Sequence, residues 1–433
     1  MISMRKDKVF IICDLDNFYV SCERVFNPKL IGKACIVSSN NNGCVVARSQ
    51  EAKDIGIKMG VPIFKIRDLI TKYDVQVLSS NYELYGEMSR RFHKILQGFA
   101  SEAHIENYSI DEAFIDLTSY QSLFDPYQYC QDIRTRIYSW LGLKVSFGIG
   151  RSKTEAKVAV HIAKKNSFFN GVCDLNAFDL CSKEHVFSEI DVGEVWGVGT
   201  RISQRLKEMD INTVLDLACA DDQIIKKYFS IVLQRTVLEL RGISCLELES
   251  VPPPKQQIIS SRSFPKPVTS RDELNDALLY HLQDAFKRLR DDKSLCGCIT
   301  TFANSNYFDK NTSYYSKSSS YVFPTPTDNL LELSKAAARL TDSIYQSGVN
   351  FKKCGVGLTF LESKTTHNYD LLTDPEDIKR NESLMSSIEE VHSKFGKKTL
   401  ALGASQMNQG NWQMTRSNLS INPFSIKSLL QIS

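Results

Sequence analysis

The sequence predicts an α+β fold with more than one hydrophobic core, and three observations support this. At 433 residues the chain exceeds what one core normally supports, so three or four domains are expected. Apolar runs in the N-terminal third follow the order strand, hairpin, helix, strand, which indicates a mixed sheet covered by helices. A later stretch reads as βαββαβ, which is typical of a second, smaller α+β domain.

The first domain begins with a strand predicted at Val9–Cys13 (V-F-I-I-C). Its continuous apolar character is typical of a strand buried on both faces. A second apolar run covers Ala34–Ser38, and Glu83–Phe99 has the apolar stripe of an amphipathic helix. The remaining elements of this domain are expected at His104–Tyr108, Ala113–Leu117, Tyr127–Leu141 and Lys144–Ile149.

The second domain follows a proline run, Pro252-Pro253-Pro254, which is stiff and cannot join a helix or a central strand. Its strands are expected at Ile258–Phe264, Leu295–Phe302, Ser318–Phe323 and Cys354–Leu361, and its helices at Asp272–Arg290 and Leu330–Gln346. From Ser363 onwards the chain is polar, and Trp412 is its only large aromatic anchor.

Composition narrows the class of protein only modestly. A formal net charge of +3 is compatible with a nucleic-acid partner but does not argue for one. No apolar stretch is long enough to cross a bilayer, so no membrane partner is expected. The twelve cysteines form no disulfide framework, and no ligand near Cys296 and Cys298 completes a zinc site. Reduced cysteines in a cytosolic protein are the expectation.

Three carboxylates at predicted strand ends form a candidate catalytic centre. Asp14 lies at the exit of the first strand, and Asp111 and Glu112 lie between the two hairpin strands. Two divalent cations about 3.5–4 Å apart need shared hard oxygen ligands to offset their repulsion, and these residues supply them. Taken alone, each segment reads more readily as a surface turn, because Asp is common in turns.

Several segments resemble Y-family translesion DNA polymerases, and in particular the UmuC-type branch, which supplies the catalytic subunit of bacterial DNA polymerase V. The first ones are D-L-D-N-F-Y-V-S-C-E (14–23), N-N-N-G-C-V-V-A-R-S-Q-E-A-K (40–53), S-S-N-Y-E-L-Y (79–85) and Y-S-I-D-E-A-F-I-D-L (108–117). The likeness continues through G-I-G-R-S-K-T-E-A-K (148–157), V-W-G-V-G (195–199) and I-I-S-S-R-S-F (258–264) to W-Q-M (412–414). It covers nearly the whole chain.

The resemblance implies a right-hand polymerase with a mixed-sheet palm, small fingers, a helix-hairpin-helix thumb and a βαββαβ little-finger domain. The implied boundaries are 1–18 and 88–175 for the palm, 19–87 for the fingers, 176–247 for the thumb, 248–257 for a linker and 258–362 for the little finger. Residues 363–433 form a C-terminal tail that is expected to bind partners.

The resemblance also assigns the catalytic residues. Asp14, Asp111 and Glu112 match the metal-binding carboxylates, and Leu15 matches the residue whose backbone carbonyl completes the shell of two Mg²⁺ ions. Tyr19, beside Phe18 in the substrate site, matches the steric gate. A flat ring against the sugar leaves no room for a 2′ hydroxyl, so ribonucleotides are refused by overpacking.

Basic residues are expected to hold the substrates. Lys53 and Lys164 match the lysines on the triphosphate, where a point charge on a flexible stem is suitable. Gln50 replaces the Tyr that many family members carry there, so its contact is in doubt. Backbone contacts to DNA are expected from Gly197 and Gly199 of a helix-hairpin-helix and from Lys157, Arg262, Lys266, Arg288 and Lys317.

The implied function is error-prone, template-directed transfer of deoxynucleoside triphosphates to primer-template DNA during the SOS response. A UmuD′-type dimer and a recombinase filament are implied partners, and the cytoplasm, at the bacterial nucleoid, is the implied location. The stretch Asn368–Asp374 occupies the place of a sliding-clamp motif but lacks its Gln and Leu-Phe, which puts clamp binding in doubt.

Two other functions stay open from the residues alone. A degenerate, non-catalytic DNA-damage scaffold would explain the altered clamp motif, although Asp14, Asp111 and Glu112 are intact. A nucleotide cyclase could use a similar sheet, paired carboxylates and two metals. It would have no use for a helix-hairpin-helix or a second DNA-sized domain.

Overall fold

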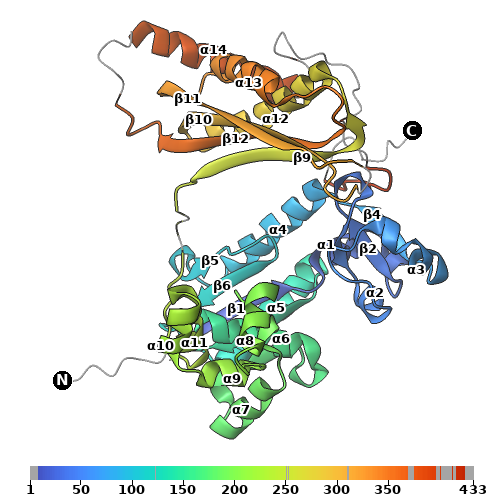
Figure 1. The fold of residues 1–433 in the computed structure, drawn as a ribbon. Coiled ribbons are helices and arrows are strands. Elements are labelled where there is room, and N and C mark those ends of the chain that lie inside the picture. Colours follow the sequence, from blue (N-terminus) through green and yellow to red (C-terminus); the bar gives the residue numbers. More distant parts are fainter. Residues whose placement is uncertain are drawn as a thin grey trace, which may run out of the picture. The chain divides into compact units, whose positions relative to one another are not determined.

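The computed structural model divides into two compact units (Figure 1). The described residues are 8–121, 123–249, 251, 253–309, 312–368, 375–395, 400, 412 and 416–424. Unit 1 contains the described residues up to 251 and also 417–424, so the chain returns to it near the C-terminus. Unit 2 contains those from 253 to 416. Each unit has a hydrophobic core of its own.

A five-stranded sheet of order β5-β6-β1-β7-β8 lies at the centre of unit 1. Its strands are β1 (Phe10–Leu15), β5 (Ile105–Glu106), β6 (Glu112–Asp116), β7 (Val145–Gly150) and β8 (Val172–Asp174). β1 pairs antiparallel with both β6 and β7, whereas β7 and β8 run parallel. The predicted mixed sheet is therefore confirmed, with strand ends that shift by a residue or two.

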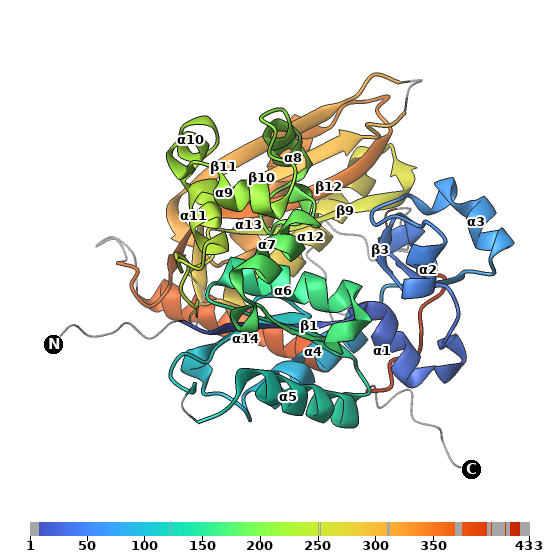
Figure 2. The same ribbon diagram turned by 90° about the horizontal axis from the view of Figure 1, so that it is seen from below.

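Helices cover both faces of this sheet. They are α4 (Tyr82–Leu96) and α5 (Pro126–Leu141) on one face and α6 (Lys153–Lys165) on the other. Figure 2 shows β1 running between α6 and the α4–α5 pair. Ile11 and Cys13 of β1 pack in the core that contains α4 and α5, whereas Ile12 packs toward α6. Alternate side chains thus enter two cores, which explains the uninterrupted apolar run of this strand.

Glycines let α6 rest directly on β7. A Cβ on Gly148 would lie 2.1 Å from the carbonyl oxygen of Ala156 and 2.3 Å from the nitrogen of Val160. A Cβ on Gly150 would lie 2.8 Å from the nitrogen of Ala156. No side chain fits in that space, so both glycines are needed for the close approach of helix and strand.

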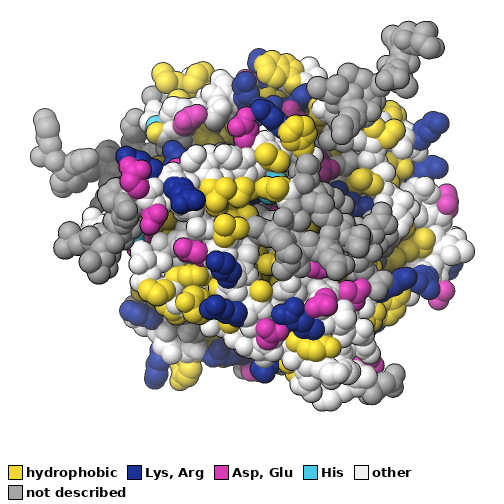
Figure 3. Space-filling model, turned by 90° about the horizontal axis from the view of Figure 1, so that it is seen from above, with side chains coloured by type: hydrophobic (Ala, Val, Ile, Leu, Met, Phe, Trp, Pro, Cys, Tyr) yellow, Lys and Arg dark blue, Asp and Glu magenta, His cyan; other side chains and the backbone are white. Residues whose placement is uncertain are grey.

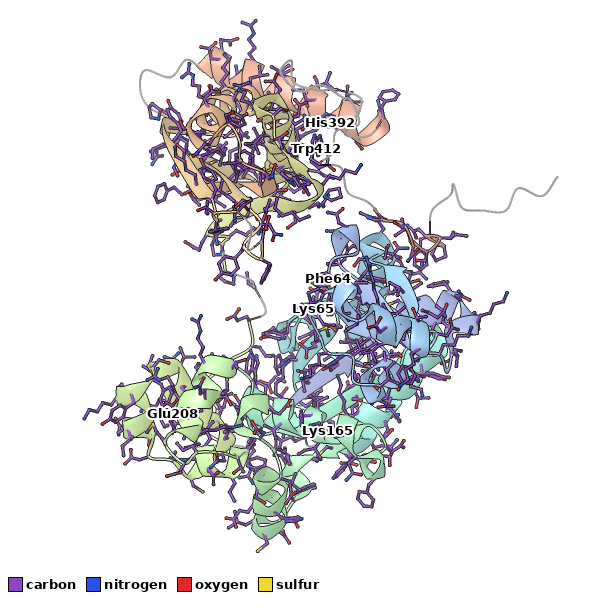
Figure 4. The ribbon with its side chains drawn as sticks, turned by 45° about the vertical axis from the view of Figure 1, so that its right-hand side comes forward. Phe64, Lys65, Lys165, Glu208, His392 and Trp412 are labelled. Carbon is purple, nitrogen blue, oxygen red and sulfur yellow. The ribbon has the colours of Figure 1, made fainter. Side chains whose placement is uncertain are left out.

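A three-stranded sheet of order β3-β2-β4 forms a separate small core in unit 1. Its strands are β2 (Cys35–Ser38), β3 (Val45–Arg48) and β4 (Gln76–Ser79), and the nearby helices are α1 (Phe18–Phe26), α2 (Gln50–Asp54) and α3 (Arg67–Lys72). Of these strands only β2 was predicted from the sequence. Phe64 and Lys65 lie exposed on the surface of this subdomain (Figure 4).

Five helices build a further core in unit 1, into which α6 also packs. They are α7 (Leu180–Ser188), α8 (Thr200–Lys207), α9 (Val214–Cys219), α10 (Asp222–Tyr228) and α11 (Ile231–Leu240). The turn Gly197-Val198-Gly199 leads into α8, and Gly197 has φ +87°, which favours glycine. A glycine turn that leads into a short helix is in keeping with the helix-hairpin-helix expected here from the resemblance.

Unit 2 has the predicted βαββαβ order and a sheet of order β11-β10-β12-β9. The elements are β9 (Gln257–Val268), α12 (Arg271–Asp291), β10 (Ser294–Ser305), β11 (Ser316–Thr327), α13 (Leu330–Ile344) and β12 (Phe351–Ser363). All its neighbouring strands are antiparallel. The α12 and α13 helices bury one face of the sheet in the unit 2 core. The predicted α+β fold class is thus confirmed in both units.

A long helix, α14 (Pro375–Phe395), was not predicted from the sequence. Met385 and Ile388 of α14 are buried in the unit 2 core, and Figure 1 shows α14 on the same side of the sheet as α12 and α13. Arg290 of α12 binds three carboxylates, at 2.7 Å from Glu382, 2.9 Å from Glu389 and 2.5 Å from Asp328. This part of the tail is therefore docked on the second domain.

Trp412, the surface charges, the cysteines and the helix lengths complete the description of the fold. Trp412 lies against unit 2, 5.2 Å from the ring of Tyr280 (Figure 4). On the face drawn in Figure 3, basic and acidic side chains are interspersed, in keeping with the small net charge. All twelve cysteines are free thiols. Within the described ranges, every helix is too short or too polar to cross a membrane.

Candidate active site

Two neighbouring strands place two of the predicted carboxylates opposite each other. Asp14 of β1 and Glu112 of β6 are register partners, so their Cα atoms face across one antiparallel pair. Both side chains are largely shielded, with 15% and 18% of their surface exposed. The sequence argument that the strand ends meet is correct for this pair.

Asp111 lies in the turn before β6 and is tied to β1 through the backbone. The Leu15 amide donates to the Asp111 carbonyl oxygen at 3.0 Å. The Ser109 hydroxyl donates to Asp111 Oδ1 at 2.7 Å, and the Asp111 amide donates back to that hydroxyl oxygen at 3.3 Å. This local turn holds the carboxylate next to the strand that carries Asp14.

Two lysines of α6 neutralise the carboxylates. Lys164 Nζ lies 2.5 Å from Asp14 Oδ1, and Lys157 Nζ lies 2.6 Å from Glu112 Oε1. Because α6 rests on β7, the helix presents both ammonium groups to the same end of the sheet. Burial, and then the Glu112 carboxylate, raise the pKa of Asp14 to about 7, although Lys164 acts in the opposite direction.

Each of the three carboxylates has a partner of its own: Lys164 for Asp14, Lys157 for Glu112 and Ser109 for Asp111. Within the described part of the chain, no three Asp, Glu, His or Cys side chains converge as the ligands of one metal ion would. Of the convergence predicted from the sequence, the structure shows the meeting of Asp14 and Glu112 but no set of three ligands. The donor set still suits a hard cation, since Asp14 and Glu112 are close enough for their charges to repel.

Lys157 stands in an aromatic enclosure that the sequence did not reveal. Its ammonium lies 4.8 Å from the centre of the Tyr108 ring and 5.8 Å from the Trp196 ring. Trp196 Nε1 donates to the Tyr108 hydroxyl at 3.0 Å. Lys157, for which a DNA contact was predicted, is thus paired with Glu112 and only 14% exposed. The Trp of the V-W-G-V-G segment, Trp196, is the one feature of the sequence from which an aromatic contact at this site could have been predicted.

Asp16, which directly follows the last residue of β1, supports the site. Its Oδ1 accepts from Ser146 Oγ of β7 at 2.9 Å and lies 3.8 Å from Lys164 Nζ. The Asp16 amide donates to the Lys144 carbonyl oxygen at 3.0 Å. These contacts fix the exit of β1 against β7.

Tyr19 lies on α1 and stacks on Tyr85 of α4. Their ring centres are 4.3 Å apart and the planes are 11° from parallel, while Tyr82 meets Tyr19 edge-on at 6.1 Å. Phe18 is buried beside them. Burial, then Tyr82 and Asp111, raise the pKa of Tyr19, so its hydroxyl lies within electrostatic range of Asp111. Tyr85 was not predicted as a site residue.

Helix α2 carries Lys53 and Gln50. Partial burial, then the positive charges of Arg48 and Lys164, lower the pKa of Lys53. The negative charges of Asp16 and Asp14 act on Lys53 in the opposite direction. Lys53 and Lys164 thus share one electrostatic neighbourhood. Gln50 is exposed and donates to Asp54 Oδ1 at 2.8 Å.

The predicted DNA contacts lie in both units. Gly197 and Gly199 form the turn before α8. In unit 2, Lys266 and Lys317 are exposed, and exposed Arg288 donates to the Ile259 carbonyl oxygen at 2.8 Å. Arg262 lies two residues from buried Ser260 and two residues from buried Phe264. Because alternate residues of a strand face the same side, Arg262 faces the helix-covered side of β9. Positions 369–374 of the clamp-like stretch lie outside the described residues.

Three segments of the chain match known protein families. The impB/mucB/samB family matches residues 13–161, which hold all three carboxylates. Its C-terminal domain matches residues 255–371 of unit 2. Residues 382–422 match a domain of unknown function.

Curated relatives extend over nearly the whole chain. The protein UmuC of Salmonella typhimurium is 39% identical, covering 95% of this chain and 97% of its own length. The protein MucB of Escherichia coli is 35% identical over 95% of this chain and 96% of its own length. A DNA polymerase IV of Dehalococcoides mccartyi is 32% identical over 49% of this chain.

Solved structures share the fold. A Y-family DNA polymerase chimera superimposes with a TM-score of 0.65, at 22% identity, and the match covers 82% of this chain and 99% of the chimera. An insertion ternary complex of the DNA polymerase Dbh gives a TM-score of 0.53 at 20% identity over 81% of this chain. The right-hand polymerase fold is thus confirmed.

Proposed function

This chain belongs to the impB/mucB/samB family, and on that premise we propose that it is an error-prone translesion DNA polymerase of SOS mutagenesis. It adds a deoxynucleotide, chosen by the template, to a primer 3′ end and releases pyrophosphate. The observation that carries the proposal is the pairing of Asp14 with Glu112 on adjacent strands, with Tyr19 on the helix that follows β1.

Asp14, Asp111, Glu112 and the backbone carbonyl of Leu15 would hold two Mg²⁺ ions. Bound ions would neutralise charge on the reacting phosphate and activate the primer hydroxyl. The fit rests on the donors, which are hard oxygens, and on the burial and the Glu112 charge that together raise the pKa of Asp14. In the present arrangement Lys164 and Lys157 supply the positive charge that these carboxylates need.

The side chains around the carboxylates bind and orient the nucleotide. Lys53 and Lys164 attract the triphosphate, since two close cations are stabilised by a polyanion. The Tyr19 ring, backed by Tyr85, fills the space that a ribose 2′ hydroxyl would need. Phe18 supports this ring from the core, and Gln50 is left without a role in the triphosphate site.

Phosphate contacts elsewhere hold the primer-template duplex. The turn Gly197-Val198-Gly199 offers backbone N–H groups at the start of α8. Lys266, Arg288 and Lys317 of unit 2 supply exposed positive charge, which positions DNA without reading its sequence. Arg262 faces the helix-covered side of β9, so a contact between Arg262 and a DNA phosphate requires its side chain to extend past the edge of the sheet.

The family relationship also suggests partners. A UmuD′-type dimer and a recombinase filament are proposed as activators, with the enzyme acting at the nucleoid in the cytoplasm. A sliding clamp is a weaker candidate, because residue 368 is Asn where the motif requires Gln.

Primer extension on a lesion-containing template, with and without a UmuD′-type dimer, tests the proposal. Extension past the lesion by the parent is expected, with the dimer increasing its rate. A non-catalytic scaffold would bind the same template without extending it under either condition, and that result would refute the proposed activity.

A further inference from the structure

A C-terminal strap, residues 417–424, lies on unit 1 beside the start of α4. The Ser79 amide donates to the Asn418 carbonyl oxygen at 2.9 Å, and the Asn418 amide donates to Ser79 Oγ at 3.1 Å. Ser79 also forms a parallel bridge with Leu419. The strap therefore continues the hydrogen bonding of β4.

Aromatic contacts anchor the far end of the strap. Phe424 meets Phe26 of α1 edge-on at 5.5 Å, and the Arg91 guanidinium of α4 lies 4.4 Å from the Phe424 ring. The strap thus touches both helices that carry the aromatic residues of the nucleotide site.

A buried carboxylate connects the strap to those residues. Glu23 of α1 is 2% exposed, and its Oε1 accepts from the Tyr85 hydroxyl at 2.7 Å and from Ser420 Oγ at 3.1 Å. Asn81 Nδ2 donates to Ser420 Oγ at 2.9 Å, while Asn81 Oδ1 caps α4 by accepting from the Leu84 amide at 3.2 Å. A buried carboxylate is costly unless its lone pairs are satisfied, so each hydroxyl matters.

Tyr85 carries this network to Tyr19. Its ring is fully buried and stacks flat on the Tyr19 ring at 4.3 Å, while its hydroxyl is held by Glu23. The position of the Tyr85 ring sets the surface against which Tyr19 rests. Three residues of the S-S-N-Y-E-L-Y segment, Ser79, Asn81 and Tyr85, take part in this relay.

We propose that the C-terminal strap is a specificity-determining part of the nucleotide site, with Ser420 a positioning residue that acts through Glu23 and Tyr85 on Tyr19. The inference deepens the proposed function and rests on its assignment of Tyr19 as the steric gate. Loosening the strap lets the Tyr19 ring recede, so the 2′ hydroxyl of a ribonucleotide is excluded less strictly.

The test measures kcat/KM for a ribonucleotide and its matching deoxynucleotide on one primer-template, using the full chain. Ser420→Ala should lower discrimination against the ribonucleotide by about three- to tenfold, the range expected for one hydrogen bond. Most of the change should be a rise in ribonucleotide kcat/KM. Ser420→Thr keeps the hydroxyl and should discriminate as the parent does.

Two controls separate positioning from support of the fold. Ile421→Ala changes a strap residue that is 76% exposed and should leave discrimination intact. Leu217→Ala destabilises the thumb core, where Leu217 is fully buried, and should lower activity without changing the ratio.

A double-mutant cycle decides the matter. If Ser420 acts through Tyr19, then Ser420→Ala adds no loss of discrimination in the Tyr19→Ala background. Equal discrimination by Ser420→Ala and Ile421→Ala, or additive effects in the cycle, would overturn the strap inference alone. No change in Tyr19→Ala would instead remove the gate assignment, and the inference with it.

Discussion

At the residue scale, the proposed function assigns the choice between ribose and deoxyribose to Tyr19. The overpacking that a 2′ hydroxyl meets there is about 1–3 kcal/mol, which corresponds to roughly 5- to 160-fold discrimination. Tyr19→Ala should therefore raise ribonucleotide kcat/KM relative to deoxynucleotide by that factor, with metal dependence unchanged. Tyr19→Phe, which keeps the bulk, is the matched control and should change selectivity little. An alanine variant as selective as the parent would make Tyr19 a core aromatic only.

The three candidate carboxylates were placed at strand ends from the apolar pattern, and the family resemblance assigned their role, but their lysine partners were not predicted. The apolar run of β1 predicted that Asp14 lies at the end of this strand, and the predicted hairpin placed Glu112 between its two strands. The structure pairs the two residues across β1 and β6. The pairing with Lys164 and Lys157 depends on how closely α6 approaches β7, which spacing along the chain does not specify. The stacking of Tyr85 on Tyr19 depends likewise on long-range packing between α1 and α4.

At the element scale, the contact between α6 and β7 positions both lysines. A methyl group on Gly148 would meet the α6 backbone at 2.1 Å, so Gly148→Ala must displace the helix. We expect a loss of about 1–3 kcal/mol in the free energy of unfolding and a larger fall in activity, because Lys164 moves with α6. Urea denaturation and primer extension measure the two effects.

Gly86→Ala is the matched control for this prediction. Gly86 lies in α4, and a Cβ there would meet nothing within 4 Å. It should therefore stabilise the helix by about 0.5–1 kcal/mol and leave activity unchanged. Equal stability of the two variants would show that α6 does not depend on the glycine.

The docking of α14 should depend on pH. The Arg290 hydrogen bond, followed by the Lys364 ion pair, lowers the pKa of Glu382 to about 2 from an ordinary 4.5. A carboxyl group whose pKa is lower in the folded protein than in the unfolded protein stabilises the fold at pH values above its unfolded-state pKa. This stabilisation is lost as the pH falls toward the folded-state pKa. Hydrogen-exchange protection of α14 should therefore fall between about pH 5 and pH 3, more than that of α13.

Glu382→Gln is the control for the pH effect. It should show weaker protection of α14 at pH 5 and a smaller change on acidification. Parent protection that does not change over this range would mean that Met385 and Ile388, not the ion pairs, hold the helix. The sequence analysis missed α14 because only Met385 and Ile388 mark its buried face, and its ion pairs join residues distant in the chain.

At the scale of the whole molecule, DNA affinity should be mainly electrostatic. Binding should weaken steeply with salt and vary little with sequence. Reversing both Lys266 and Lys317 to Glu should reduce the salt slope by about two, one for each lost phosphate contact. Lys379→Glu on α14, where the side chain is 75% exposed, is the charge-matched control. A slope that falls equally in the control would argue against the unit 2 sheet as the binding surface.

The central claim is that Asp14, Asp111 and Glu112 catalyse deoxynucleotide transfer with bound metal. Single-turnover primer extension by Asp111→Asn, with DNA affinity measured on the same preparation, tests it most directly. The variant keeps the size of the side chain but loses its charge. Loss of several kcal/mol of transition-state stabilisation predicts extension slower by about a thousandfold or more. DNA affinity should stay within about twofold, since phosphate contacts lie elsewhere. Extension by Asp111→Asn at the parent's rate would contradict the account.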